Sequence, residues 1–293
     1  MQNDAVLYVV ATPIGNVDDL TPRALRTLKE VDLVAAEDTR RTGRLLAHWG
    51  IKQNLISYHD HGEEKRAEKL LQRMVDQSLA VALVSDAGTP CVSDPGYRLV
   101  SMAHARGVAV HPVPGVSALI SLVSTAGLPC HRFTFVGFLP GKPAALRREI
   151  TSWKNASPPA AVIFYESPRR LHRTLEVVAG ILPAARLAVG RELTKLHEEI
   201  KTGSVEDLLA WAGQHSTLRG EVAVMVWPGE EEGPVAGSGE RQLLEDSLSR
   251  ELAGGSTMRD LLRRYRDCGL SRSELYQLLL DLKSAQAGEG EDE

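Results

Sequence analysis

Short apolar runs alternate with amphipathic stretches over the first part of the chain, and this alternation limits the possible folds more than any other feature. The apolar runs are VLYVVATP (6–13), DLVAAED (32–38), NLISYH (54–59), LAVALVSD (79–86) and VAVHPVP (108–114). Nearly continuous apolar runs are typical of strands whose two faces are both buried. Their alternation with helices predicts a parallel sheet joined by right-handed crossovers.

Residues that favour helix ends lie between these runs. Thr21 followed by Pro22 is typical of an N-cap and the first position of a helix, and Gly50 is typical of a helix end. The segment 63–77 is strongly amphipathic, because one stripe carries Ala67, Leu70, Leu71 and Met74. These signals predict helices between the strands.

A second α/β pattern follows, with apolar runs at 133–140, 160–167, 186–193 and 221–227. Beyond it, a Gly-rich acidic segment is typical of a flexible linker, and amphipathic stretches with helix-turn-helix-like spacing indicate a small helical module. We therefore predict two α/β domains plus a small C-terminal helical module. The predicted division is an N-terminal α/β domain, a C-terminal α/β domain, a linker, a helical module and a disordered tail, at 1–115, 116–228, 229–240, 241–285 and 286–293.

Composition excludes several classes of protein. A net charge of −4 excludes a globally basic nucleic-acid binder, so phosphate contacts must come from local arginine clusters. Three distant cysteines without a CxxC pair favour neither a disulfide framework nor a zinc site, and we expect no metal. No apolar run approaches the roughly 20 residues that span a bilayer, and the N-terminal segment carries an acid where a signal peptide needs positive charge. We expect a cytoplasmic protein.

Three polar loops follow strand ends in the first half: TPIGNVDD, EDTRRTG and SDAGTPCVSDPG. In open parallel sheets, ligands bind at this edge, so these loops are candidates for one crevice. GxGxxG and GxxxxGK[ST] are both missing, which disfavours a conventional dinucleotide or ATP site. From these residues alone, a ligand site and a structural turn remain equally open.

Eight segments, in order, carry a resemblance to a known family. They are LYVVATPIGNVDDLTPRAL, VAAEDTRRT, VSDAGTPCVSDPG, PVPGVSAL, FVGFLP, FYESPRR, GRELTKLHEE and RGEVAVMV. Together they resemble the tetrapyrrole-methylase-like superfamily, and more closely its branch of ribosomal RNA small-subunit methyltransferases I. Where tetrapyrrole methylases usually carry Gly-Gly-Asp-Pro, this chain has Ala-Gly-Thr-Pro at 87–90, and this departure favours the RNA branch.

The resemblance implies two α/β domains with S-adenosylmethionine bound in a cleft between them, usually in a homodimer. It implies 2′-O-methylation of a cytidine ribose in 16S ribosomal RNA, in the decoding region of the small subunit. The cofactor-binding residues that it implies are Pro13, Asp86, Ala87, Gly88, Thr89, Val92, Ser117, Ala118, Tyr165 and Leu193. The alternative for each is a purely structural role.

A ribose hydroxyl is a poor nucleophile near neutral pH, so a positioned base is expected to help the reaction. Glu166 and Asp38 rank first, ahead of Glu37 and Asp94, although an acid at a helix start is favoured for structural reasons as well. Five basic residues are the candidates for contacts to RNA phosphates: Arg40, Arg41, Arg169, Arg170 and Lys195.

Two other functions remain open. One is a methyltransferase acting on a tetrapyrrole precursor, which shares the implied fold and cofactor but needs neither the arginine clusters nor the helical module. The other is a non-catalytic regulator that binds nucleic acid through the C-terminal module, which leaves the polar strand-end loops unexplained.

Overall fold

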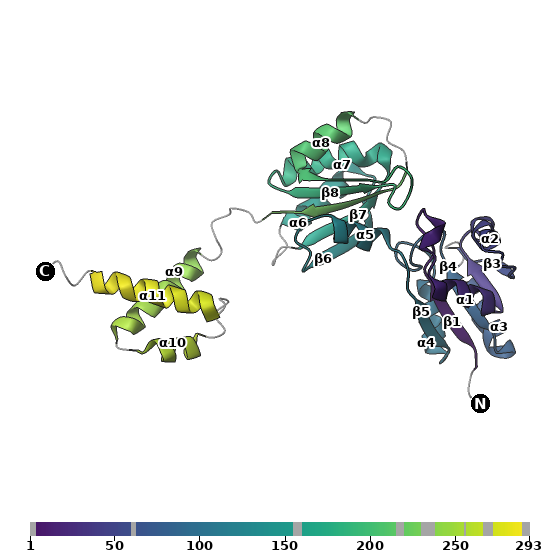
Figure 1. The fold of residues 1–293 in the computed structure, drawn as a ribbon, viewed down its shortest axis with the longest axis horizontal. Helices are drawn as coiled ribbons and strands as arrows, with labels where there is room; N and C mark the ends of the chain where they lie inside the picture. The colour runs from purple at the N-terminus through teal and green to yellow at the C-terminus, as the bar shows by residue number, and fades with distance from the viewer. Residues whose placement is uncertain are drawn as a thin grey trace. The chain divides into compact units, whose positions relative to one another are not determined.

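The computed structural model describes residues 4–59, 63–154, 160–214, 220–229, 238–254, 256–265 and 272–288. The chain forms two compact units, Met1–Gly229 and Glu230–Glu293, which are described separately here. The first unit contains two five-stranded sheets with their helices, and the second is helical (Figure 1).

The first sheet is fully parallel, as the alternation predicts, in the order β3-β2-β4-β1-β5. Its strands are β1 (Val6–Val10), β2 (Leu33–Ala36), β3 (Leu55–Ser57), β4 (Ala80–Val84) and β5 (Ala109–Val113). The third strand is shorter than the predicted 54–59, because it lies at the edge and its described partner β2 is itself only four residues long.

Both faces of this sheet are buried, which explains the continuous apolar runs. Leu7, Leu33 and Leu83 pack with helices α3 (Glu63–Gln77) and α4 (Tyr97–Ala105) on one face. The other face packs with α1 (Pro22–Glu30) and α2 (Thr39–His48) through the alternate strand residues, including Val10, Val34 and Val84. The predicted cap is confirmed, since the Thr21 hydroxyl accepts a hydrogen bond from the Ala24 amide at 3.2 Å.

The second sheet is mixed, in the order β6-β7-β10-β8-β9. Its strands are β6 (Phe133–Phe138), β7 (Ala161–Glu166), β8 (Arg186–Arg191), β9 (Glu199–Ser204) and β10 (Val222–Trp227). Only β6 and β7 pair in parallel, whereas β10 is antiparallel to both β7 and β8, and β8 is antiparallel to β9. An apolar run indicates a buried strand but not its direction, so the sequence did not reveal this pairing.

Different helices cover the two faces of the second sheet. One face packs against α6 (Pro143–Lys154), α7 (Pro168–Ile181) and α8 (Val205–Gln214). The other face packs against α5 (Ala118–Thr125), together with Ile14, which follows β1. Residues of the first sheet's loops therefore share an apolar cluster with the second sheet.

The second unit is formed by α9 (Ser238–Ala253), α10 (Met258–Arg264) and α11 (Arg272–Gly288) around a small leucine core. Two predicted boundaries differ from the structure: α9 begins inside the predicted linker 229–240, and α11 ends inside the predicted disordered tail 286–293. Ser238 with Glu240 favours a helix start, and Ala285, Gln286 and Ala287 favour continuation of a helix. The rest of both segments, 230–237 and 289–293, lies outside the described residues.

None of the helices in the described part of the chain combines the length and the apolar character that crossing a membrane requires.

Candidate active site

A cavity of about 380 Å³ lies in the first unit, with walls from both sheets. This volume lies within the usual range for small-molecule sites, about 300–1,000 Å³. Eight of the ten predicted cofactor-binding residues line it: Ala87, Gly88, Thr89, Val92, Ser117, Ala118, Tyr165 and Leu193. The structure thus brings together residues from four separate stretches of sequence, while their contact with a cofactor stays a prediction.

The first wall is the loop after β4, which is held against the end of β1. Thr12 and Gly88 exchange two backbone hydrogen bonds of 2.9 Å each. The Thr12 hydroxyl donates to the Ser85 carbonyl at 3.3 Å, and the Ser85 hydroxyl donates to the Ala87 carbonyl at 3.3 Å. Gly88 has a φ of +77°, a conformation that suits glycine. These bonds fix where the loop's backbone faces the cavity.

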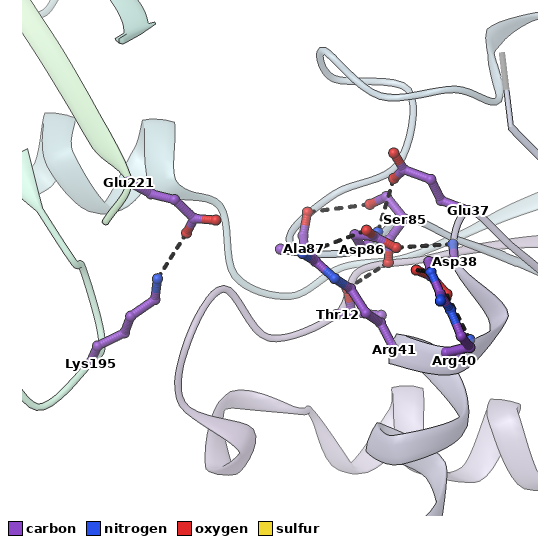
Figure 2. Close-up of polar contacts among 10 residues, drawn as sticks. All are labelled: Thr12, Glu37, Asp38, Arg40, Arg41, Ser85, Asp86, Ala87, Lys195 and Glu221. Atoms are coloured by element: carbon purple, nitrogen blue, oxygen red, sulfur yellow. Dashed lines mark hydrogen bonds and ion pairs between the residues drawn. The ribbon is translucent and has the colours of Figure 1, made fainter. Parts of the chain in front are cut away.

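Asp86 does not line the cavity, in contrast to the prediction, but locks two loops together (Figure 2). Its amide donates to the Glu37 carboxylate at 3.1 Å, and its own carboxylate accepts from the Asp38 amide at 3.0 Å. The same carboxylate pairs with Arg41 at 3.2 Å. Asp86 therefore shapes the wall from behind. Pro13 is likewise not a lining residue, although it lies between Thr12, which holds the loop, and Ile14, which lines the cavity.

Asp38, one of the two candidate bases, is not a lining residue either. It caps α2, because its carboxylate accepts from the Arg40 amide at 2.8 Å, and it pairs with the Arg40 guanidinium at 3.0 Å. Hydrogen bonds from the Arg40 side chain, then from its backbone, lower the pKa of Asp38 to about 2. A carboxylate held so firmly in its ionised form, away from the cavity, is a poor proton acceptor, so its geometry favours a structural role.

Glu166, the other candidate base, is part of the cavity wall, but its side chain is only 1% exposed. Its carboxylate accepts from the Ser167 amide at 2.7 Å and from the Thr174 hydroxyl at 2.8 Å, and it pairs with Arg170 at 3.1 Å. Arg170 also donates to the Leu139 carbonyl at 2.7 Å. The Glu166 carboxylate is thus occupied by donors within the protein, which disfavours a role as a base. The Arg170 guanidinium is bonded to Glu166 and to a backbone carbonyl, which disfavours a role as an RNA contact.

Aromatic rings form the opposite wall. Tyr165 lies edge-on to Phe135 and Phe138, with ring centroids 4.9 and 5.7 Å apart. The register of β6 shifts between Phe135 and Phe138 around Gly137, whose φ is +65°, and such a bulge re-aims the next side chain. Phe138 is consequently 64% exposed at the cavity. Burial raises the pKa of Tyr165, so its hydroxyl remains protonated near neutral pH.

Lys195 pairs with two carboxylates and is not a lining residue. Its ammonium lies 2.9 Å from Glu192 and 3.0 Å from Glu221. Burial lowers the pKa of Lys195, but the hydrogen bonds to Glu192 and Glu221 outweigh burial and raise it above its ordinary value. Figure 2 shows this ion pair, in which Lys195 faces Glu221. Glu221 does line the cavity, at the start of β10. Glu221 was not among the residues predicted from the sequence, although it stands in the segment RGEVAVMV.

The predicted RNA-binding arginines differ in exposure. The Arg40 side chain is 86% exposed and the Arg41 side chain 58% exposed, although each pairs with an aspartate. Arg169 is exposed at the start of α7. These three remain compatible with RNA contact, whereas Arg170 is partly exposed and its guanidinium is bonded to Glu166 and to the Leu139 carbonyl.

Comparison with known proteins gives a consistent result. Residues 6–209 match the family model described as Tetrapyrrole (Corrin/Porphyrin) Methylases. The chain is 40% identical to Ribosomal RNA small subunit methyltransferase I of Mesorhizobium japonicum, over 98% of this chain and 95% of that protein. It is 45% identical to the protein of the same name from Halalkalibacterium halodurans, over 75% of each chain.

Solved structures share the fold. The uroporphyrin-III C-methyl transferase from Thermus thermophilus, complexed with S-adenyl homocysteine, matches with a TM-score of 0.52 and 22% identity. The match covers 75% of this chain and 96% of that one. At this identity, the similarity establishes the fold of the first unit.

Proposed function

The chain belongs to the family of ribosomal RNA small subunit methyltransferase I, within the tetrapyrrole methylases, and from this premise we propose that it methylates 16S ribosomal RNA. The reaction is transfer of a methyl group from S-adenosylmethionine to the 2′-hydroxyl of a cytidine ribose in the decoding region. Membership across nearly the whole chain is the observation that carries this proposal.

The residues of the cavity fit the cofactor. Its volume suits a nucleoside-sized ligand, and small residues such as Ala87, Gly88 and Ala118 let the backbone approach it closely. Carboxylates of Asp94 and Glu221 line the cavity and complement the positive charge of a sulfonium. When bound, S-adenosylmethionine supplies an already activated methyl group.

The protein's contribution to this reaction is alignment and exclusion of water. The loop after β4, held by Thr12, presents a fixed backbone to one side of the ligand. Tyr165 and Phe138 shield the other side with aromatic surface. The eight predicted residues that line the cavity are the proposed cofactor contacts, while Asp86 supports the loop from behind and Pro13 lies between Thr12 and Ile14.

The proposal also covers the location, the form of the substrate, the oligomeric state and the domain division. The protein acts in the cytoplasm on 16S RNA or on the assembled small subunit, as a homodimer. Within the first unit, residues 1–115 and 116–228 act as two domains, and the second unit, with α9 to α11, is a separate helical module. The separate apolar clusters on the two sheets support this division.

The direct test of function is to map ribose methylation in 16S RNA from cells with and without this protein. One 2′-O-methylcytidine is expected to disappear in its absence and to return when purified protein and S-adenosylmethionine are added to small subunits from those cells. Unchanged methylation, with methyl transfer to a tetrapyrrole precursor instead, would support the alternative function.

Deleting residues 230–293 is expected to leave cofactor binding within about twofold, because the described residues that line the cavity all belong to the first unit, which has its own apolar cores. Isothermal titration with S-adenosylhomocysteine measures this. A regulator that binds nucleic acid through the helical module would instead lose nucleic-acid binding on truncation.

Reversing the charge of Arg40 and of Arg169 is expected to weaken RNA binding about tenfold and to reduce the salt slope by roughly one to two, since each contributes a phosphate contact. Cofactor affinity stays unchanged, because neither side chain lines the cavity. Arg41 is left intact, since a glutamate there would face Asp86 and disturb the loop. The matched control is Arg73→Glu. Arg73 lies on the last turns of α3, near the amino ends of the parallel strands, whereas the site loops follow their carboxyl ends. Equal loss of RNA and cofactor binding would contradict the RNA contact.

A further inference from the structure

Among the described residues, three acids line the cavity; Glu166 is buried and Asp94 half-buried, whereas Glu221 is exposed. It lines the wall at the start of β10, and its side chain is 70% exposed. One of its oxygens accepts from the Lys195 ammonium at 3.0 Å. A carboxylate has about four acceptor positions, so this bond leaves capacity for a substrate hydroxyl.

Strand register separates Glu221 from Glu166, although the two acids are near neighbours in the sheet. Glu166 is paired directly with Val222, and both belong to the side that packs under α7. Glu221 directly precedes β10, and its carbonyl accepts from the Glu192 amide at 3.0 Å, so the pairing with the chain after β8 continues to this residue. Successive residues alternate between faces, which places Glu221 on the side of Ala223 and Tyr165, which line the cavity. Glu166 borders the cavity, but its carboxylate is buried on the α7 side of the sheet, whereas Glu221 lies on the side of the ligand space.

The position of Glu221 is set by the segment after β8. The Glu192 carboxylate accepts from the Glu221 amide at 3.0 Å and from the Lys195 ammonium at 2.9 Å. Gly220 has a φ of +99°, and a side chain there would collide with the Glu192 carboxylate. Glu192 and Thr194 themselves have positive φ values of 51° and 69°. Such backbone strain in non-glycine residues is typical of functional sites, where surrounding contacts maintain it.

The same segment is also tied to the loop after β1. The Asn16 amide donates to the Thr194 hydroxyl at 3.1 Å. A Cβ added at Gly15 would collide with the Lys195 side chain, because it would lie 2.9 Å from the Lys195 Cε. Lys195 is therefore confined between Gly15 on one side and the two carboxylates on the other. Its ammonium can hold the Glu221 carboxylate in one orientation toward the cavity.

We propose that Glu221 is the group that accepts the proton of the ribose 2′-hydroxyl, and that Lys195 is the positioning residue that orients it. This inference rests on the proposed function and adds a catalytic residue to it. As the ribose oxygen bonds to the methyl carbon, the carbon–sulfur bond breaks and leaves its electron pair on the sulfur. The hydroxyl proton passes to the Glu221 carboxylate and from there to solvent.

The first experiment measures single-turnover methylation of small ribosomal subunits by Glu221→Gln. The rate is expected to fall by about 100-fold or more, as for loss of a general base, while affinity for S-adenosylhomocysteine, which carries no sulfonium charge, stays within about twofold and subunit affinity falls no more than about tenfold. Glu221→Asp, which keeps a carboxylate, is expected to recover part of the rate. Glu206→Gln, an exposed acid on the first turn of α8, is the matched control. If the wild type methylates the subunits and the rate of Glu221→Gln lies within threefold of the wild-type rate, this inference is overturned but the proposed function is not.

The second experiment does not depend on catalysis. Small subunits are reconstituted with ribose or 2′-deoxyribose at the mapped cytidine, and their affinities are compared in the presence of S-adenosylhomocysteine. A hydrogen bond to a charged group predicts about tenfold preference for ribose in the wild type, reduced to about threefold or less in Glu221→Gln. Equal preference in both proteins would show that the hydroxyl does not contact Glu221.

The role of Lys195 is tested by a double-mutant cycle. If Lys195 acts through Glu221, Lys195→Met slows methylation, and adding it to Glu221→Gln slows the reaction no further. Additive losses would mean that Lys195 contacts the substrate or supports the fold by itself. Absence of methylation in the wild type would instead contradict the proposed function.

Discussion

Glu166→Gln is expected to destabilise the first unit by about 3 kcal/mol, at the lower end of the range for breaking a buried ion pair, because Arg170 is partly solvated. The amide would place hydrogens toward the Ser167 amide, the Thr174 hydroxyl and Arg170, all of which donate to this carboxylate. For a unit of this size, the melting temperature should fall by roughly 6–12 °C. Thermal unfolding followed by circular dichroism measures the change.

Glu176→Gln is the matched control, because Glu176 lies on the same helix and its side chain is 55% exposed. It is expected to change stability by less than about 0.5 kcal/mol. If Glu166 were the catalytic base, its glutamine variant would keep native stability and lose turnover. The two variants Glu166→Gln and Glu221→Gln thus separate a structural acid from a catalytic one.

Gly88→Val is expected to weaken cofactor binding by about 100-fold or more, since a β-branched residue at a φ of +77° is strongly disfavoured. An added Cβ would also lie 3.3 Å from Ile14, which lines the cavity. Relief of this strain must shift the loop and break its two hydrogen bonds to Thr12. Isothermal titration with S-adenosylhomocysteine measures the affinity.

Gly107→Val separates backbone strain from loss of the site. Gly107 has a φ of +68° and open space around its would-be Cβ, and it lies in the turn before β5, away from the cavity. Both variants should lose a similar amount of stability from backbone strain, about 1–2 kcal/mol. Only Gly88→Val should lose cofactor affinity, and equal affinity in the two variants would show that the loop after β4 does not contact the cofactor.

Much of the fold follows from local sequence. The Thr21–Pro22 pair sets the start of α1, and the doubly apolar runs of the first half indicate a parallel sheet covered on both faces. The second half carries apolar runs of the same kind, yet β10 lies antiparallel between β7 and β8. Pairing direction depends on how the chain returns to the sheet, and apolar periodicity does not encode it.

The candidate site divides in the same way. Loops at the ends of parallel strands meet at one edge, which made the loop that carries Ala87 and Thr89 a candidate for the site, whereas Ser117 was added by the family resemblance. The roles of the charged residues were not accessible in this way. Asp86 and Asp38 stand beside the site in sequence, but their carboxylates accept from a neighbouring loop or helix start.

By itself, the sequence determined the parallel first sheet and, through its ordered motifs, the family, because strand ends and glycine-rich turns leave local signatures. It also singled out the loops after β1 and β4, which border the cavity, but its third candidate loop, EDTRRTG, contributes no lining residue in the described part of the chain. Only the tertiary structure decided which acid faces the ligand space. Glu166 and Glu221 lie more than fifty residues apart in the chain, and the pairing of Glu166 with Val222 places them on opposite faces of one sheet. Strand register is a long-range property, so the face on which a residue lies, and on which the proposal for Glu221 depends, is known only once the strands are paired.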